Sequence, residues 1–211
     1  MEADRSLEPL ARELAALPPS LGLVRLIGVD GHAGSGKTTF AGRLAGALGG
    51  AAVLHLDEVA THEELFGWPE RLRAQVLEPL AAGRPAHWTP YDWVERRFGP
   101  RRVLEPAAVL LVEGVGAGRR ALRPYLARLL WMETPRATAW GRGRDRDGRE
   151  LSGFWDGWER AERAHFADDP SRPFAGTLVR QSGTGYEWTS GVGATAGTTG
   201  SVTEGDGLPR A

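Results

Sequence analysis

Cysteine is absent from the 211-residue chain, so it can form neither a disulfide nor a thiolate metal site. Long apolar runs are also absent, and none approaches the roughly 18–20 residues that a membrane span needs. The first twenty residues are acidic and amphipathic and lack the apolar region of a signal peptide. The formal net charge of −1 gives no general attraction to nucleic acid or to an anionic membrane. These absences predict a cytoplasmic protein with neither kind of partner.

Lysine is nearly absent as well, because Lys37 is the only one among 26 basic residues. It lies in GVDGHAGSGKTTF, residues 28–40, which fits the pattern G-x-x-x-x-G-K-[ST]. Glycines in this pattern let successive backbone N–H groups point at phosphate oxygens, and the following helix presents its positive N-terminus to the same anion. An ammonium is a compact, movable point charge, whereas a guanidinium is a larger planar fork. We therefore predict that Lys37 binds the β- and γ-phosphates of a nucleotide and that the Thr38 hydroxyl binds Mg²⁺.

The alternative is an ordinary glycine-rich turn. The context favours the phosphate loop, because an apolar run precedes it, a helical pattern follows it, and two further apolar runs end in acids. The residues predicted to bind the nucleotide are Gly31, His32, Ala33, Gly34, Ser35, Gly36, Lys37, Thr38 and Thr39.

Four apolar runs are typical of buried strands in a parallel sheet, and these are residues 23–30, 51–58, 107–118 and 128–134. A fifth, short strand is expected at 177–180. Helical patterns lie between or beside the strands, at 7–17, 37–48, 69–83, 135 onward and 151–169. Alternating strands and helices predict an α/β fold, specifically the three-layer P-loop NTPase fold, in which helices flank a parallel sheet.

The predicted domain organisation has three parts. Residues 1–20 hold an N-terminal helix that ends at Pro18-Pro19, and residues 21–180 form the nucleotide-binding domain. Pro79 is expected to kink or break its helix, and the segment 84–102 is expected to be a loop or a short hairpin. The Gly/Thr/Ser-rich segment 181–211 shows no periodicity, so it is predicted to be a disordered tail.

Two acids follow predicted strands, Asp57 after the second and Glu113 after the third. Ligands of open parallel sheets bind at the carboxyl ends of the strands, so both carboxylates are expected to face a magnesium-bound nucleotide. Glu113 suits the metal or its water shell, since Mg²⁺ takes one or two carboxylates together with phosphates and waters. Asp57 is placed to accept a proton from an attacking hydroxyl. The alternative for each is a solvated acid at a strand end.

Arginines crowd the segment GRGRDRDGRE, residues 141–150. A solvated charged loop is the ordinary interpretation of such a run. The second interpretation is a lid that closes over the nucleotide, whose arginines neutralise the transferred phosphoryl group and exclude water. The arginines of this segment are Arg142, Arg144, Arg146 and Arg149.

These motifs together resemble the uridine kinase family and its relatives among small-metabolite kinases, phosphoribulokinase and bacterial pantothenate kinase included. GVDGHAGSGKTT, HLDE, LEPLAAGRPAHWTPYDW, VLLVEG and an R-x-x-x-R-D segment occur in the family's order over roughly residues 23–170. The resemblance implies that Asp57 is the base, that Glu113 belongs to the magnesium site, and that Arg142 and Arg146 act in the lid. It also implies that Tyr91 lies at the acceptor pocket, within the family's Y-D pair.

The chain departs from that family where the acceptor is recognised. Gly67 and Trp68 stand where uridine kinases usually carry an acid for the ribose hydroxyls, and arginines stand where they carry a pyrimidine-reading histidine. Arg96 or Arg97 facing the acceptor would instead favour an anionic substrate. Tryptophans such as Trp93 either form a wall of the acceptor pocket or pack in the core; the predicted acceptor-binding residues are Asp57, Tyr91, Trp93 and Arg96.

Two functions follow from these residues. The first is an ATP- and Mg²⁺-dependent kinase that phosphorylates a hydroxyl of a small metabolite, with a nucleoside such as uridine or cytidine among the acceptors. The second is a P-loop ATPase or nucleotide switch that acts on a protein partner, for which the sequence offers no guanine-reading N-K-x-D motif. The family resemblance also implies a homo-oligomer.

Overall fold

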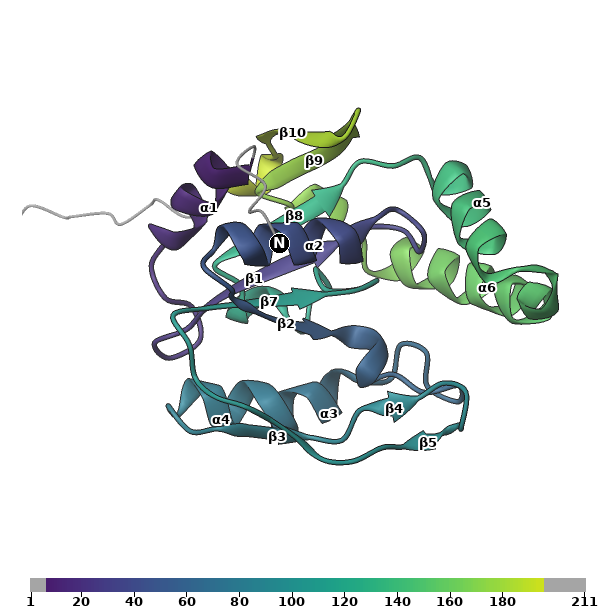
Figure 1. The fold of residues 1–211 in the computed structure, drawn as a ribbon, viewed down its shortest axis with the longest axis horizontal. Coiled ribbons are helices and arrows are strands. Elements are labelled where there is room, and N and C mark those ends of the chain that lie inside the picture. The colour runs from purple at the N-terminus through teal and green to yellow at the C-terminus, as the bar shows by residue number, and fades with distance from the viewer. Residues whose placement is uncertain (1–6, 196–211) are drawn as a thin grey trace, which may run out of the picture.

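The structure is a computed structural model that describes residues 7–195, and its centre is a six-stranded sheet (Figure 1). The strands lie in the order β10-β9-β8-β1-β7-β2. All neighbours pair in parallel except β9 and β10, which are antiparallel. The strand bounds are β1 (Arg25–Asp30), β2 (Ala52–His55), β7 (Val109–Glu113), β8 (Arg128–Met132), β9 (Thr177–Ser182) and β10 (Gly185–Ser190). The predicted α/β fold with a parallel sheet is therefore confirmed.

Helices cover both faces of this sheet, as buried parallel strands require. Ile27 and Val29 of β1 pack with α1 (Glu8–Ala15) and α2 (Lys37–Ala47), whereas Leu26 belongs to the apolar cluster on the opposite face. That second cluster includes α3 (Pro69–Leu72), a π-helical turn (Arg73–Leu77) and α4 (Glu78–Ala81). The predicted N-terminal helix is thus present within 8–15 and is part of the core.

The segment 69–81 is continuous helix through Pro79, so the predicted break is not there. Proline lacks the N–H that would bond to the carbonyl four residues earlier, and its ring clashes with that carbonyl in a regular α-helix. The π turn over Arg73–Leu77 widens the helix just ahead of the proline and accommodates the ring.

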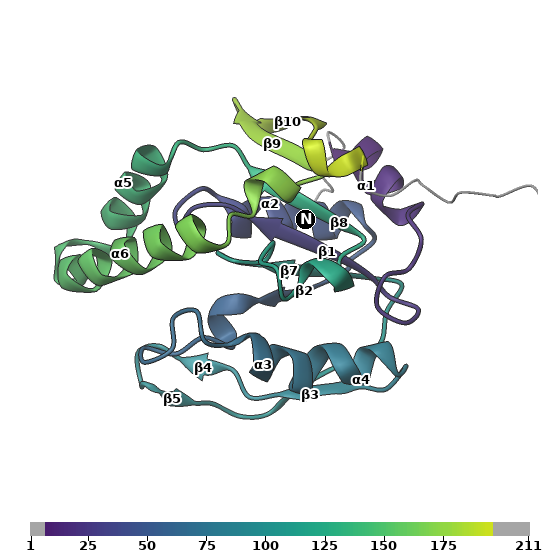
Figure 2. The same ribbon diagram turned by 180° about the vertical axis from the view of Figure 1, so that it is seen from behind.

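The segment 84–102 was predicted to be a loop or a short hairpin, and it forms a hairpin. β3 (Ala86–Trp88) pairs with β6 (Arg102–Leu104), and β4 (Tyr91–Asp92) pairs inside it with β5 (Arg97–Phe98). This nested hairpin lies beside α3 and α4, on the β2 side of the sheet (Figures 1 and 2).

The predicted disordered tail is wrong for residues 181–195. β9 extends to Ser182, and β10 returns antiparallel to it after a turn at Gly183, where φ is +58°. Tyr186 and Trp188 pack against the apolar cluster of α1 and α2. These two side chains provide buried apolar area that the average composition of the segment does not reveal. The remaining part of that prediction, 196–211, lies outside the described residues, as do residues 1–6 of the N-terminal segment.

Two further helices, α5 (Arg136–Asp147) and α6 (Ser152–Asp168), form a helical hairpin at one end of the sheet (Figures 1 and 2). The charged segment expected at 141–150 is therefore the second half of α5 and the turn that follows it. No helix within residues 7–195 combines the length and the apolar character that crossing a membrane requires. Short 3₁₀ turns complete the chain at Leu56–Glu58, Arg123–Tyr125, Arg149–Leu151, Arg172–Phe174 and Val192–Thr195.

Candidate functional site

The glycine-rich loop connects β1 to α2, as the sequence predicts. Gly34 has φ of +79°, and a Cβ there would lie 2.0 Å from the carbonyl oxygen of Ala139 on α5. Gly36 starts α2 in the left-handed conformation and provides no side-chain cap, which leaves the positive end of the helix open to an anion. Lys37 is only 6% exposed, and its Nζ donates to the His32 carbonyl 2.9 Å away.

Asp30, the last residue of β1, fixes the start of this loop. Its side chain is fully buried and accepts backbone hydrogen bonds from Gly31, Gly116 and Gly118 at 2.7, 3.0 and 2.8 Å. Burial raises the pKa of Asp30, and the bonds from Gly118 and Gly31 oppose that shift. The carboxylate therefore ties the phosphate loop to the turn after β7.

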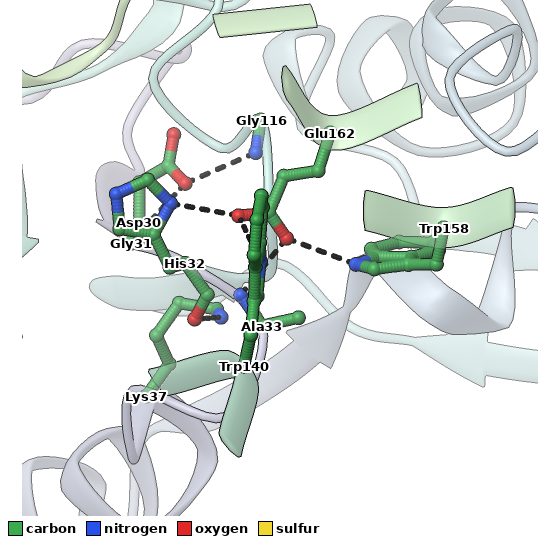
Figure 3. A network of polar contacts seen from close by, with 9 residues as sticks. All are labelled: Asp30, Gly31, His32, Ala33, Lys37, Gly116, Trp140, Trp158 and Glu162. Carbon is green, nitrogen blue, oxygen red and sulfur yellow. Dashed lines mark hydrogen bonds and ion pairs between the residues drawn. The ribbon is translucent and has the colours of Figure 1, made fainter. Parts of the chain in front are cut away.

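Glu162 of α6 binds the same loop from the other side (Figure 3). It is fully buried, and its two oxygens contact four nitrogens: His32 Nδ1 at 2.7 Å, the Ala33 N–H at 3.1 Å, and the indole N–H groups of Trp140 and Trp158 at 3.0 and 2.9 Å. Burial favours the neutral acid, but the bonds from His32, Ala33 and Trp158 outweigh it and lower the pKa of Glu162. Glu162 thus holds α5 and α6 to the phosphate loop.

Replacing Glu162 by alanine is expected to destabilise the protein by about 3–5 kcal/mol, because buried donors lose their acceptor. Glutamine is expected to be little better, because its amide NH₂ would face N–H groups that also donate. Because folding lowers the pKa of Glu162, its carboxylate stabilises the folded protein at pH values above the ordinary carboxyl pKa. This stabilisation is lost as the pH falls through the pKa of Glu162 in the folded state. Thermal unfolding of the variants across pH measures both effects.

Glu159 provides the matched control, one helical turn earlier on α6. It bonds Arg144 Nε at 2.7 Å and is partly exposed, so Glu159→Ala is expected to cost less than about 1 kcal/mol. Equal unfolding temperatures for the Glu159 and Glu162 variants would contradict the role given to Glu162.

The two predicted acids lie at the carboxyl ends of neighbouring strands. Glu113 ends β7 and is 5% exposed, and Asp57 lies two residues beyond β2, in the 3₁₀ turn Leu56–Glu58. His55 bonds Glu113 Oε2 through Nδ1 at 2.7 Å, and this bond raises the pKa of His55. Asp57 is open to the cleft, yet desolvation by the surrounding walls and the charge of Glu113 raise its pKa.

A magnesium ion fits the donors at this point. Glu113 and Thr38 contribute a carboxylate and a hydroxyl to one cleft, and Mg²⁺ accepts such oxygens when phosphates and waters complete its shell. Within residues 7–195 no three His, Cys, Asp or Glu side chains cluster closely enough to hold a metal by themselves. These residues would therefore bind Mg²⁺ together with a nucleotide.

One cleft of about 660 Å³ brings half of the predicted site residues together. Its walls come from the phosphate loop, the turns after β2 and β7, the end of α5, α6 and the nested hairpin. The predicted residues that line it are Ala33, Gly34, Lys37, Thr38, Asp57, Trp93, Glu113 and Arg146. Trp68 borders the cleft but is 1% exposed, and both it and Trp88 belong to the apolar core.

The other predicted residues do not line the cleft; five of them, Gly31, His32, Ser35, Gly36 and Thr39, belong to the phosphate loop and its helix start, and three lie elsewhere. Arg142 is exposed on α5 and is not part of the cleft wall. Tyr91 is buried behind the wall, where its hydroxyl lies 3.1 Å from His62 Nδ1. Arg96 is exposed and pairs loosely with Glu63 at 3.7 Å, so the prediction that it faces the acceptor is corrected. It lies in the turn of the nested hairpin with a φ of +53°, and it is not part of the cleft wall.

Sequence reasoning also missed residues that the cleft uses. Glu162 and His55 gave no signal, because their partners lie 129 to 130 and 58 positions away. Trp155 and Trp158 have the spacing of one helix face, which predicts core packing; Trp155 is buried as predicted, with 2% exposed, and both residues also border the cleft. The same spacing would have indicated a cavity wall only if the helix were known to border one.

The sequence matches no protein-family model and no curated protein. Among solved structures, the chain resembles a "Possible Uridine Kinase" from Bacillus stearothermophilus, with 21% identity and a TM-score of 0.53 over 72% of this chain and 95% of that one. It also resembles a "putative fructose transport system kinase" from Silicibacter sp. TM1040, with 19% identity and a TM-score of 0.51 over 78% and 89%. The chain therefore shares the α/β fold of these two proteins.

Proposed function

We infer that this protein is an ATP-dependent kinase that transfers a γ-phosphoryl group to a hydroxyl of a small molecule. The observation that carries this proposal is that the phosphate loop, Asp57 and Glu113 share one cleft of about 660 Å³ with aromatic side chains of α6 and the nested hairpin. A phosphate site that opens into a chamber of this size suits transfer to a bound acceptor rather than to bulk water. Nucleosides such as uridine and cytidine are among the candidate acceptors.

Each of the main residues of the cleft has its own role in the proposed reaction. Lys37 and the loop amides bind the phosphates, and Thr38 and Glu113 would hold magnesium, which neutralises phosphate charge when bound. The acceptor oxygen forms a bond to the γ-phosphorus, the bond to the β–γ bridging oxygen breaks, and ADP leaves. Asp57 accepts the hydroxyl proton, and its raised pKa suits that role. Arg146 lies at the cleft beside Asp147, which it binds at 2.6 and 3.0 Å.

Nucleotide turnover tests this function directly. With ATP and Mg²⁺ alone we expect slow ADP release, and with a mixture of hydroxyl acceptors we expect a rise of about tenfold or more, because a bound acceptor replaces excluded water. Mass spectrometry of the acceptors should show the added phosphoryl group. Turnover that depends on Lys37 but responds to no hydroxyl compound would instead support an ATPase or a switch.

A further inference from the structure

The cleft has two chemically different ends. Its ionisable residues gather near the phosphate loop and the strand ends. The remaining wall is dominated by aromatic and aliphatic side chains. The half-buried residues His62, Trp93, Phe154 and Trp158 supply its aromatic surface, and the buried Trp68 and Trp155 border it with only 1% and 2% of their surface exposed. The aromatic end has room for an acceptor, and its surface decides which acceptor binds.

The polar edges of three of these rings are already occupied. Trp93 Nε1 donates to the Asp57 carbonyl at 2.9 Å, Trp155 Nε1 to Asp147 at 3.1 Å, and Trp158 Nε1 to Glu162 at 2.9 Å. Figure 3 shows the indole of Trp158 directed at Glu162. Because these N–H groups are bonded within the protein, the rings present mainly carbon to the cleft.

The aromatic residues also form a continuous wall across the cleft. His62 and Trp93 lie 4.7 Å apart between ring centroids, Trp93 and Phe154 lie 6.0 Å apart, and Phe154 stacks on Trp158 at 6.1 Å. Trp93 comes from the nested hairpin and Phe154 from α6, so the wall joins two elements far apart in the sequence. Flat rings of this kind bind another flat ring by stacking or by edge contacts.

The charged side chains that line the cleft already have partners or roles in the proposed reaction. Among the described residues that line it, the lysine and arginine side chains are Lys37, which lies in the phosphate loop, and Arg146, which Asp147 binds with both oxygens. The lining carboxylates are Asp57, Glu113 and Asp147. An acidic acceptor would therefore find no uncommitted cation, and a sugar diol would find no uncommitted carboxylate at the aromatic end.

We propose that the acceptor is an uncharged alcohol that carries a flat aromatic or heteroaromatic ring, recognised through the ring and without use of a vicinal diol. This rests on the proposed kinase function and names its substrate class. The ring lies against Trp93 and Phe154, and its hydroxyl reaches Asp57 at the boundary between the two ends. Phosphoryl transfer then follows the step given above, with the hydroxyl proton passing to Asp57.

An acceptor panel with the full chain, ATP and Mg²⁺ tests the proposal. The panel contains hydroxymethylpyridine and hydroxymethylpyrimidine, uridine and 2′,3′-dideoxyuridine, and glycerate, pantothenate and fructose. We expect kcat/KM for the best ring-bearing alcohol to exceed that for the acids and fructose by about tenfold or more, and the two uridines to agree within about threefold. A site that bonded the diol would reject the dideoxy compound by far more.

Wall variants show whether the rings are responsible. Phe154→Ala is expected to raise KM for the preferred acceptor about tenfold while the Kd for ATP changes less than twofold. Trp93→Phe keeps a ring but loses the bond to the Asp57 carbonyl, so it should retain most of the acceptor affinity, whereas Trp93→Ala should not. Arg96→Ala is the matched control, because Arg96 belongs to the same hairpin but lies outside the cleft.

The outcomes separate the two proposals. Preference for glycerate, pantothenate or fructose, or loss of more than about a hundredfold with dideoxyuridine, would overturn the acceptor class and leave the kinase standing. If no ring-bearing alcohol is phosphorylated, saturable quenching of tryptophan fluorescence by these alcohols is the second measurement, and its absence in a protein that binds ATP would also overturn it. Failure to bind ATP at all would overturn the proposed function itself.

Discussion

Lys37→Met is expected to lower kcat by about 10²–10³-fold, because the developing charge on the phosphates loses its one buried cation. Methionine matches the length of lysine and its side chain is apolar, so the 6%-exposed site should still be filled and the fold retained. Lys37→Arg is expected to fail as well, since a planar guanidinium is larger than the ammonium that the loop encloses. A coupled assay for ADP measures kcat, and titration with a fluorescent ATP analogue measures nucleotide affinity.

Arg84→Met is the control for this experiment, because it removes a cation at an exposed position outside the cleft. Circular dichroism and thermal unfolding establish that each variant is folded. A folded Lys37→Met protein whose ATP affinity and turnover stay within about threefold of the original would refute the phosphate-loop interpretation. Loss of turnover in both Lys37 variants, with the Arg84 control unchanged, would support it.

The phosphate loop and the sheet were predictable because their signals are local. The loop is a contiguous pattern between an apolar run and a helix, and its glycines are needed for backbone reasons that hold wherever the pattern occurs. Asp57 and Glu113 were predictable for a related reason, because the carboxyl ends of parallel strands meet at one edge of the sheet. Each of these inferences needs only the order of elements along the chain.

The side-chain environment of the cleft was not predictable in this way. Glu162 reaches Ala33 only because α6 folds back along the phosphate loop, and no periodicity in residues 151–169 encodes that approach. Arg96 fails for the opposite reason: its sequence position is near Trp93, but its side chain lies exposed at the surface beside Glu63. Distance along the sequence therefore predicts neither the contact of Glu162 with Ala33 nor the position of Arg96.

Composition misled the prediction for the last strand. The segment after Gln181 is rich in glycine, serine and threonine, and the average hides two aromatic residues at alternate positions, Tyr186 and Trp188. In β10 both pack against the helical layer, and every residue from Gly185 to Ser190 has a partner in β9. Alternation over six residues carries more information here than composition does.

Asp57→Asn is expected to lower kcat by about 10²–10⁴-fold, because asparagine has nearly the same shape but cannot accept the hydroxyl proton. Desolvation and the charge of Glu113 raise the pKa of Asp57, so the base is lost as the pH falls through this raised value. We therefore expect kcat/KM for the acceptor to fall on the acid side of a pH profile, and the asparagine variant to lose that part of the profile.

Stability provides the independent check on this variant. A carboxyl whose pKa is raised by folding binds its proton more tightly in the folded state, so it favours folding at low pH and opposes folding as the pH rises through that pKa. Asparagine removes this cost. At neutral pH, the Asp57→Asn variant should therefore unfold at the same temperature as the original protein or at a higher temperature. A variant that is less stable, or one that keeps both its rate and its acid limb, would show that Asp57 serves the fold and not the proton transfer.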